Sequence, residues 1–421
     1  MFVRNDVTVD ARVLKEAASL RDAGHAVTIL GITRPGAPRE VERELRDGFE
    51  IVRVPLPAWR PWWRWLRVPS RVASIVRHRS LHARPGGRMD AFDWLAMWRF
   101  GTLGWARDVA RIAGRADVYH GHDLTGLPAA ILARRLHHRG ARVVYDSHEL
   151  YIESAATVGR PAWAVGWLRR RERAWAAEAD ALVAVSDAQA DHLRPRLGIR
   201  RVVVVHNCPP RPSASAARTT LLGDALGLPA GVRHVLYTGG LRAGRGIEEL
   251  ALAMLEPGLA AAHLTFLGFG PLAPDVEHLA ADPRFGGRLH LMPPVAPTDV
   301  VRWVSSADVA GMAIQATNRS YELSTPNKLF EALAAGVPVA GSDLPGFRAI
   351  VAGNPEGPLG ELFDQTSPAS IGTAIRRILD LPRAEYAAMA ERAKQAAVER
   401  WNWETESARL VELYRDFETG Q

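Results

Sequence analysis

The sequence predicts an α/β protein of two domains, each built around a parallel sheet. Three observations lead to this prediction. The chain has 421 residues, of which 47% are hydrophobic, and this is enough to bury two cores. Short apolar runs alternate with helical patterns, which indicates crossover connections between parallel strands. The alternation stops in the Pro-, Ser- and Ala-rich stretch CPPRPSASAARTT at residues 208–220 and then restarts.

The first half begins with MFV, which is only three residues long where a buried strand usually has five or six. A helix is predicted over residues 10–23, because Val13, Ala17 and Leu20 recur on one face and Gly24 stands at the position of a C-terminal cap. The strand-length runs that follow are HAVTILG, ADVYHGHD, ARVVYDSHE, DALVAVSD and RVVVVHN, with helical patterns at 127–138 and 163–179 between them. These elements predict a Rossmann-like domain over residues 1–209.

The same alternation predicts a second Rossmann-like domain over residues 210–400. Its elements are the strands RHVLYTGG, HLTFLGFG, RLHLMPP, ADVAGMAI and VPVAGSD and the helices 247–254 and 326–335. Residues 401–421 carry Leu410, Leu413 and Phe417 at helical spacing, which predicts a terminal helix that packs back on the first domain. The two domains are expected to face a shared cleft, because ligands bind at the carboxyl ends of such sheets.

The formal net charge of +7 is distributed unevenly, since residues 1–200 hold 33 basic and 22 acidic side chains and the rest hold 20 and 24. The segment 53–88 has no acid and combines nine arginines with four tryptophans. Indoles favour the headgroup level and basic residues are attracted to anionic lipid, so an anionic membrane surface is the expected partner. A solvated arginine-rich insertion is the alternative. No nucleic-acid partner is expected, because zinc-finger, RNP and basic-zipper motifs are missing.

The only cysteine, Cys208, excludes a disulfide framework and a metal site made of cysteines. The N-terminal residues lack the basic, apolar and small-residue succession of a signal peptide. The longest apolar runs are shorter than the roughly 20 residues that a membrane span needs. The sequence therefore predicts a cytoplasmic protein that is at most peripheral on the inner face of the membrane.

An anion site is predicted at the start of the helix 326–335. Thr325 and Pro326 suit an N-cap and a first helical position. The unpaired amides of the first turn, the helix dipole and the ammonium group of Lys328 all favour an anion, and phosphate is the expected one.

Glu331 lies one turn beyond this anion site, on the face that also carries Asn327 and Lys328. A carboxylate is a poor neighbour for phosphate but a good acceptor for the two hydroxyls of a ribose. We therefore expect Glu331 to bind the sugar of a nucleotide, with an ordinary helix-surface glutamate as the alternative.

Two further loops are candidates for ligand binding. In YTGGLRAGRGIEEL, several glycines after a strand allow close approach of a ligand, and Arg242 and Arg245 add positive charge. The loop GFGPLA from Gly268 fits the dinucleotide pattern G-x-G-x-x-A, which would indicate a dehydrogenase. That function is disfavoured, because the next strand GGRLHLMPPV ends without the acidic residue that holds a ribose.

Taken together, these segments resemble the glycosyltransferases of family 4 over nearly the whole chain. The matching stretches, in order, are DARVLKEAASLRDAGHAVTILG, DVYHGHDLTGLPAA, VVYDSHELY, DALVAVSD, YTGGLRAGRGIEEL, FLGFGPL and NKLFEALAAGVPVAGSDLPG. The resemblance implies the GT-B arrangement of two Rossmann-like domains. It also implies transfer of a sugar from a nucleotide sugar to an acceptor hydroxyl with retention at the anomeric carbon. No metal or other cofactor is expected, and the sequence has no Asp-x-Asp pair to hold one.

The resemblance assigns roles on the donor side. Arg245 and Lys328 would stabilise the charge of the departing nucleoside diphosphate, together with the helix N-terminus. The residues that would frame the nucleoside base are Gly268, Phe269 and Gly270.

It also assigns roles in the first domain. His122 would contact the donor sugar, with a histidine bonded to backbone as the alternative. His120 lies two residues earlier on the same strand face and competes for this role. Glu149 of DSHELY is expected to be an acceptor-side carboxylate.

The sequence departs from the family pattern at two positions. The usual second glutamate, counted back from Glu331, falls on Leu323, so either donor-sugar recognition is altered or Glu322 takes over through a shifted loop. Gly240 stands where many members have an arginine, and Arg242 is expected to compensate.

The leading functional prediction is a retaining, nucleotide-sugar-dependent glycosyltransferase that acts on a lipid-linked or other membrane-associated acceptor. A sugar-nucleotide 2-epimerase of similar fold is the alternative enzyme. A family member that binds a nucleotide sugar or a membrane without catalysis is the third hypothesis.

Overall fold

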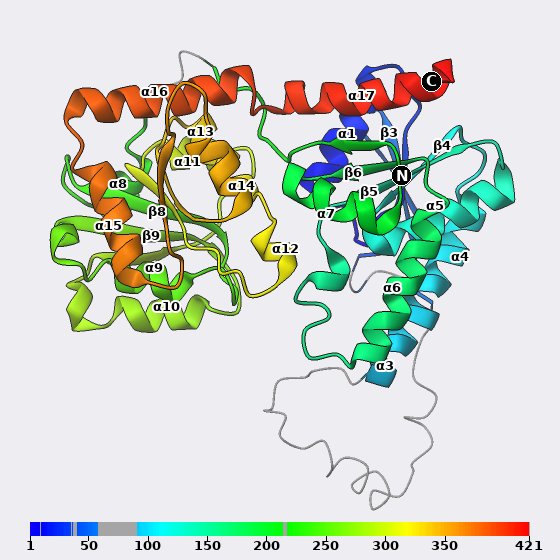
Figure 1. Ribbon diagram of the computed structural model, residues 1–421, viewed down its shortest axis with the longest axis horizontal. Helices are drawn as coiled ribbons and strands as arrows, with labels where there is room; N and C mark the ends of the chain where they lie inside the picture. The colour runs from blue at the N-terminus through cyan, green and yellow to red at the C-terminus, as the bar shows by residue number, and fades with distance from the viewer. Residues whose placement is uncertain (9, 35, 37–39, 58–90, 214–216, 421) are drawn as a thin grey trace, which may run out of the picture. The chain divides into compact units, whose positions relative to one another are not determined.

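A computed structural model of the chain describes residues 1–8, 10–34, 36, 40–57, 91–213 and 217–420 (Figure 1). The chain divides into two compact units. The first contains Met1–Leu182 and Arg194–Arg201, and the second contains Val183–Leu193 and Val202–Gln421. Strands alternate with helices in both halves of the chain, so the predicted α/β class with two Rossmann-like sheets is confirmed. The domain boundaries expected at residues 209 and 400 stay a prediction.

Two sheets carry the strands of the N-terminal half. The three-stranded sheet has the order β1-β3-β2, with β1 parallel and β2 antiparallel to β3. The four-stranded sheet has the order β4-β5-β6-β7, and β4 is parallel to β5. The strands are β1 (Thr28–Ile32), β2 (Glu42–Arg46), β3 (Phe49–Val54), β4 (Val118–His122), β5 (Arg142–Ser147), β6 (Ala181–Ala184) and β7 (Val202–Val204).

The short N-terminal stretch MFV joins these two sheets. Phe2 forms parallel bridges with Leu30 of β1 and Gly121 of β4. Its amide donates to the carbonyl of His120 at 2.7 Å, and its carbonyl accepts from the amide of His122 at 2.9 Å. The predicted strand is thus represented by isolated bridges at Phe2, which holds the carboxyl end of β4.

The first turn of α5 (Asp123–His137) also packs closely on Phe2. A Cβ atom at Gly126 would lie 2.3 Å from the carbonyl oxygen of Phe2, and one at Gly121 would lie 2.7 Å from Cα of Leu127. Glycine at both positions allows this approach, so α5 begins directly after His122, the last residue of β4. The helix predicted at 127–138 thus starts four residues earlier than expected.

Two other helices of the N-terminal half were predicted from the sequence, over residues 10–23 and 163–179, and the remaining ones were not. The predicted helix 10–23 is α1, and Asp10 caps it by accepting from the amide of Val13 at 3.2 Å. The bounds are α1 (Ala11–Asp22), α3 (Ala91–Ala96), the π-helix η2 (Met97–Thr102), α4 (Leu103–Ile112), the 3-10 helix η3 (Tyr151–Glu153), α6 (Ala162–Ala176) and α7 (Asp187–Leu197).

The second unit contains a six-stranded sheet of order β10-β9-β8-β11-β12-β13, in which every adjacent pair is parallel. Its strands are β8 (Arg233–Gly240), β9 (Ala262–Phe269), β10 (Leu289–Met292), β11 (Val309–Met312), β12 (Val339–Ser342) and β13 (Gly360–Phe363). The four-residue strand β13 was not predicted from the sequence.

Helices flank this sheet (Figure 1). They are α8 (Leu221–Leu226), α9 (Ile247–Ala253), α10 (Ala273–Ala280), α11 (Val300–Val304), α12 (Arg319–Glu322), α13 (Asn327–Ala334), α14 (Pro345–Phe347), α15 (Pro368–Leu379) and α16 (Arg383–Glu399), with the short helices η4 (Pro257–Leu259), η5 (Pro283–Phe285) and η6 (Arg348–Ala352). Alternate residues of β8 enter different apolar clusters, Leu236 with Phe330 of α13 and Val235 with Leu250 of α9. Since side chains alternate along a strand, the two clusters cover opposite faces of the sheet.

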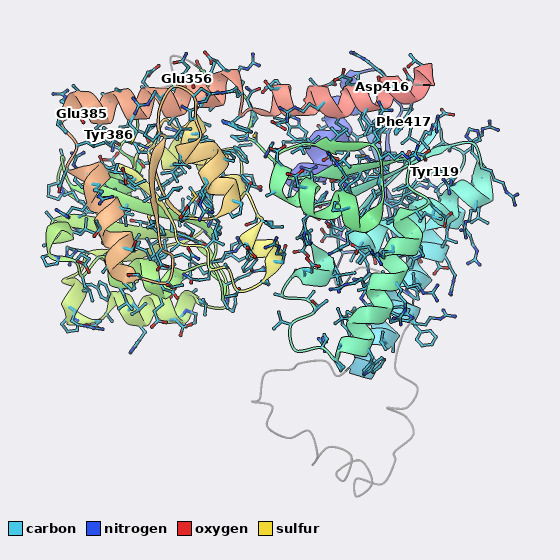
Figure 2. The ribbon with its side chains drawn as sticks, viewed as in Figure 1. Tyr119, Glu356, Glu385, Tyr386, Asp416 and Phe417 are labelled. Carbon is cyan, nitrogen blue, oxygen red and sulfur yellow. The ribbon has the colours of Figure 1, made fainter. Side chains whose placement is uncertain are left out.

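The predicted terminal helix is α17 (Trp403–Thr419). Leu410 and Leu413 are buried, and Phe417, which is labelled on this helix in Figure 2, lies beside Tyr414 with ring centroids 6.3 Å apart. The side chain of Glu406 accepts from the amide of His206 at 2.8 Å, just after β7. The helix therefore packs on β7 and the residues that follow it. These residues lie before residue 210, within the range on which the terminal helix was expected to pack.

The basic segment 53–88 falls mainly on residues 58–90, which lie outside the described part of the chain. Arg53 can be described, and its assignment to a membrane-facing surface is wrong. Its side chain is 1% exposed, donates to Glu44 at 2.7 Å and donates to the carbonyl of Asp6 at 2.7 Å. Among the described helices, none is long and apolar enough to cross a membrane.

Candidate functional site

Two glycine-rich loops meet at the carboxyl edge of the six-stranded sheet. The parallel register pairs Gly239 with Gly268 and Gly240 with Phe269 at the ends of β8 and β9. A Cβ atom at Gly268 would lie 1.9 Å from the carbonyl oxygen of Gly239, and one at Gly270 would lie 2.2 Å from a backbone oxygen of the neighbouring loop. Glycine is therefore required at these positions, and the structure brings the two predicted loops together.

The loop after β8 then folds against the segment that follows β11. The carbonyl of Gly244 accepts from the amide of Gln315 at 2.9 Å, and a Cβ atom at Gly246 would lie 1.8 Å from the carbonyl oxygen of Ala313. This packing holds Arg245 with its guanidinium 4.5 Å from the ring centroid of Tyr321. The predicted cation thus stands against an aromatic face at this edge of the sheet.

Lys328 reaches the same place from the first turn of α13. Its Nζ atom lies 3.4 Å from the ring centroid of Tyr237 on β8, and 3.6 Å from the position of a Cβ atom at Gly239. The Nζ atom is buried and has no hydrogen-bond partner among the residues that the structure describes. Burial, followed by repulsion from Arg245, holds the pKa of Lys328 well below its usual value.

The start of α13 differs from the expectation in one respect. Pro326, not Thr325, is the N-cap residue, and no side chain caps the helix. Thr325 is instead buried and would contact a side chain at Gly346, whose Cβ atom would lie 2.6 Å from the threonine oxygen. The amide of Leu329 donates to the carbonyl of Pro326 at 3.0 Å, and among the described residues no side chain caps the amides that precede it.

The remaining donor-side candidates differ in how far their side chains are exposed. Asn327 is exposed, and Glu331 is half-buried on α13, where its charge partly offsets the lowering of the pKa of Lys328. Phe269 is 62% exposed at the end of β9. Arg242 is exposed, and its Nε atom lies 3.7 Å from the position of a Cβ atom at Gly240. Arg242 therefore lies beside the position that a side chain at residue 240 would occupy.

Glu322 and Leu323 lie in different surroundings. Glu322 forms an exposed ion pair with Arg319 at 2.7 Å on α12. Leu323 is 5% exposed and packs in the apolar interior. Leu323 is therefore part of the apolar interior, and the carboxylate of Glu322 already has a basic partner.

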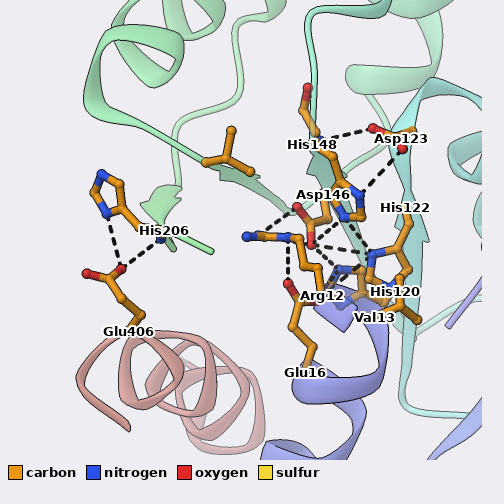
Figure 3. A network of polar contacts seen from close by, with 12 residues as sticks. Arg12, Val13, Glu16, His120, His122, Asp123, Asp146, His148, His206 and Glu406 are labelled. Carbon is orange, nitrogen blue, oxygen red and sulfur yellow. Dashed lines mark hydrogen bonds and ion pairs between the residues drawn. The ribbon is translucent and has the colours of Figure 1, made fainter. Parts of the chain in front are cut away.

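In the first unit, seven polar side chains form a histidine–carboxylate cluster, in which all except Asp123 and His148 are buried (Figure 3). Its members are Arg12 and Glu16 of α1, His120 and His122 of β4, Asp123 of α5, Asp146 of β5 and His148 directly after β5. The parallel register of β4 and β5 places His122 opposite Asp146. Of these residues the sequence analysis named only the two histidines of β4.

Asp146 lies at the centre of the cluster. Its Oδ2 atom is 3.4 Å from a ring nitrogen of each of three histidines, His120, His122 and His148. Its Oδ1 atom accepts from Nη2 of Arg12 at 3.1 Å. Burial opposes ionisation of this carboxyl group, but Arg12 and the histidines hold its pKa well below its usual value.

Glu16 has the opposite electrostatic balance. Burial and the nearby charge of Asp146 raise its pKa well above the usual value, although Nε of Arg12 lies 2.9 Å from its Oε1 atom. Glu16, His120, His122 and Asp146 also place one ligand atom each within 4.8 Å of the others, as a metal site would. Arg12 already supplies a positive charge to both carboxyl groups, and we assign no metal ion to the cluster.

His122 is held by side chains, which contradicts the alternative of a histidine bonded to backbone. Its Nδ1 atom lies 3.1 Å from Nε2 of His148, and its ring stacks on His120 with centroids 4.4 Å apart. Glu149 is exposed and lies outside the cluster. The motif YDSHE contained the signal for the missed pair, because Asp146 and His148 stand at the end of a predicted strand beside the predicted His-x-His strand.

Two Rossmann-like sheets, with glycine loops and a lysine-bearing helix at the carboxyl edge of the second, are typical of the GT-B class of glycosyltransferases. The model of the Glycosyl transferase 4-like domain matches residues 8–208, and that of Glycosyl transferases group 1 matches residues 232–381. The two matches together cover most of the chain. The chain belongs to the glycosyltransferases of family 4.

Curated relatives agree with this assignment. A D-inositol 3-phosphate glycosyltransferase from Xylanimonas cellulosilytica is 30% identical over 56% of this chain and 57% of its own length. The chain thus matches little more than half of that relative. A GDP-mannose-dependent alpha-(1-6)-phosphatidylinositol monomannoside mannosyltransferase from Mycolicibacterium smegmatis is 24% identical over 92% of this chain and 90% of its own length.

Solved structures share the fold at low sequence identity. A sucrose-phosphate synthase from Thermosynechococcus elongatus has a TM-score of 0.68 and 18% identity, with 97% of this chain and 93% of that chain covered. A UDP-forming alpha,alpha-trehalose-phosphate synthase from Burkholderia vietnamiensis has a TM-score of 0.68 and 16% identity, with 99% of both chains covered. These similarities confirm the GT-B fold of the chain.

The role of Arg12 in the cluster can be tested by substitution. Arg12→Met should lower the free energy of unfolding by about 3–5 kcal/mol, because it leaves buried acidic groups without their basic partner. The control is Arg21→Met on the same helix, which removes an exposed ion pair with Asp22 and should cost at most about 1 kcal/mol. Urea unfolding of the three proteins measures both values. Equal losses in the two variants would show that the cluster does not depend on Arg12.

Proposed function

We propose that the chain is a retaining glycosyltransferase whose second unit binds the diphosphate of a nucleotide sugar beside Lys328. The observation that carries this proposal is the Lys328 ammonium group, which is buried against Tyr237 and Gly239 without a hydrogen-bond acceptor among the described residues. A buried cation is costly unless an anion or acceptor satisfies it. A phosphate oxygen at Nζ would supply both charge and hydrogen bonds.

Other groups at this edge suit a diphosphate. The carboxyl ends of β8 and β9 carry glycines, whose backbone a ligand can approach closely. Arg245 lies against Tyr321, and the first amides of α13 point along a helix dipole that favours anions. We infer that Phe269 and the glycines beside it border the base, and that Glu331 accepts the hydroxyls of the ribose.

The proposed chemistry is charge stabilisation of a departing group. When the bond between the anomeric carbon and the diphosphate breaks, negative charge develops on the phosphate oxygens. Lys328 and Arg245 would stabilise that charge from fixed positions, which is often the largest contribution to catalysis. In this proposal His122 of the first unit binds the donor sugar, and Glu149 contributes to acceptor binding.

The acceptor that we propose is a hydroxyl group of a phosphorylated or lipid-linked polyol. The supporting observation is that the curated relatives are named for D-inositol 3-phosphate and for phosphatidylinositol monomannoside. A 2-epimerase would differ in a measurable way, because it turns over the nucleotide sugar without any acceptor.

The first test is acceptor-dependent release of nucleoside diphosphate from a panel of nucleotide sugars and polyol acceptors. We expect release only when both substrates are present, and about 10²-fold slower turnover in Arg245→Ala, the scale of losing one charge-stabilising group. Arg284→Ala is the control, since Arg284 forms an exposed ion pair with Asp282 away from the proposed machinery. Release without acceptor would favour the epimerase, and unchanged turnover in Arg245→Ala would reject the assigned role.

Lys328 provides a second test through proton linkage. Its pKa is lowered in the free protein and should rise when a diphosphate binds, so binding should take up protons and weaken as the pH increases. Calorimetric titration of nucleoside diphosphate in buffers of different ionisation enthalpy measures this uptake.

The matched variants are Lys328→Met, which should abolish the proton uptake, and Lys394→Met, which removes the other lysine of the second unit and should leave it unchanged. Equal proton uptake in the wild type and in Lys328→Met would show that the diphosphate does not change the protonation of Lys328, and would contradict the assigned role.

A further inference from the structure

The ring of His122 has two nitrogens in different surroundings. Its Nδ1 atom faces Nε2 of His148 at 3.1 Å, Oδ2 of Asp146 at 3.4 Å and Oε2 of Glu16 at 4.0 Å. Its Nε2 atom is buried and makes no hydrogen bond within the described residues. The hydrogen bond at one ring nitrogen determines which nitrogen carries the proton. The contact with His148 therefore determines whether Nε2 of His122 carries a proton.

His148 is placed to donate this hydrogen bond. Its backbone amide donates to Oδ1 of Asp123 at 3.0 Å, and its ring nitrogens lie 3.5 Å from Asp123 and 3.4 Å from Asp146. Although burial opposes a charged ring, these two carboxyl groups raise the pKa of His148 to about 10. At neutral pH both ring nitrogens of His148 therefore carry protons, and Nε2 can only donate.

The competing partner for Nδ1 of His122 is the carboxylate of Asp146. That distance of 3.4 Å is longer than the 2.7–2.9 Å expected of a hydrogen bond to a charged carboxylate, whereas 3.1 Å to His148 is within the ordinary range. A proton on Nδ1 would also face the proton on Nε2 of His148. Burial and then the neighbouring His120 lower the pKa of His122 well below its usual value, so its ring is neutral.

We propose that His148 is a positioning residue whose hydrogen bond to Nδ1 holds His122 as the neutral tautomer with its proton on Nε2. In this tautomer His122 presents a hydrogen-bond donor at Nε2 and cannot accept a proton there. Its role in the proposed function is then to donate to an oxygen of the donor sugar, and it does not act as a general base. The role in transfer rests on the proposed function, whereas the tautomer does not.

The groups that face the two histidines come from every element packed around them. They are Arg12 and Glu16 of α1, His120 of β4, Asp123 of α5 and Asp146 of β5. Since Arg12 and His148 carry the positive charges that compensate Asp146, we expect the tautomer of His122 to be present at pH 7 and to be lost as His148 deprotonates near pH 10.

The direct experiment is nitrogen NMR of the full chain labelled with 15N-histidine, at pH 7 and without substrate. The resonances of His122, one of 14 histidines, are assigned by their loss in His122→Gln. We expect Nε2 to carry the proton and Nδ1 to be unprotonated. A proton on Nδ1, or on both nitrogens, would overturn the proposal whatever reaction the protein catalyses.

Two substitutions test whether His148 sets this tautomer. His148→Gln keeps an amide donor near the place of Nε2, and should keep the proton of His122 on Nε2. His148→Leu removes the donor, and should give a mixture of tautomers. If His148→Leu does not fold, His148→Gln remains the test, and a proton on Nδ1 of His122 in that variant would overturn the proposal. An unchanged tautomer in a folded His148→Leu would show that His148 is not the positioning residue.

Activity separates the donor role from a base. His122→Gln retains an N–H near the position of Nε2, whereas the shorter His122→Asn does not reach it. With a nucleotide sugar that the wild type uses, a donor role predicts that kcat/KM of His122→Gln is at least 10-fold above that of His122→Asn. Equal losses, together with a kcat that falls at low pH in the wild type, would indicate a base and overturn the donor role. If the wild type uses no nucleotide sugar, the proposed function fails while the NMR result still stands.

Discussion

Both candidate sites depend on the parallel pairing of neighbouring strands, which brings residues that follow different strands to one edge of a sheet. In the second unit this pairing places Gly239 opposite Gly268, so that the two glycine loops touch through backbone. In the first unit it places His122 opposite Asp146. An antiparallel arrangement would send the ends of adjacent strands to opposite edges, and neither group of side chains could form.

The two sites balance their charges in different ways. The histidine–carboxylate cluster is compensated internally, because Arg12 and His148 supply positive charge to Asp146 at distances of 3.1–3.4 Å. At the edge of the second sheet, Lys328 and Arg245 lie close to aromatic rings and repel one another. These two side chains give this edge an excess of positive charge. An internally balanced cluster is suited to hold a side chain in one state, whereas an unbalanced site is suited to bind an anion. This contrast supports a positioning role for the first cluster and a diphosphate site for the second.

Much of the fold and of the donor-side loops could be predicted from the sequence, because short apolar runs and glycine-rich turns are local signals. Lys328 was found for the same reason, since it stands in the first turn of a helix. Arg12 and Glu16 were missed because they lie about 100 residues or more from their partners, on a helix whose apolar spacing explains its pattern without them.

Other errors came from ignoring tertiary packing. Thr325 has the chemistry of a cap, but its side chain is buried and Pro326 takes the N-cap position. Arg53 belongs by composition to a basic segment, yet it is buried beside Glu44.

The central claim is that a nucleotide sugar binds at Lys328, and a crystal structure with bound nucleoside diphosphate tests it most directly. The account predicts phosphate oxygens within hydrogen-bond distance of Lys328 Nζ and Arg245. A diphosphate bound elsewhere, with Lys328 still against Tyr237 and without an acceptor, would contradict it.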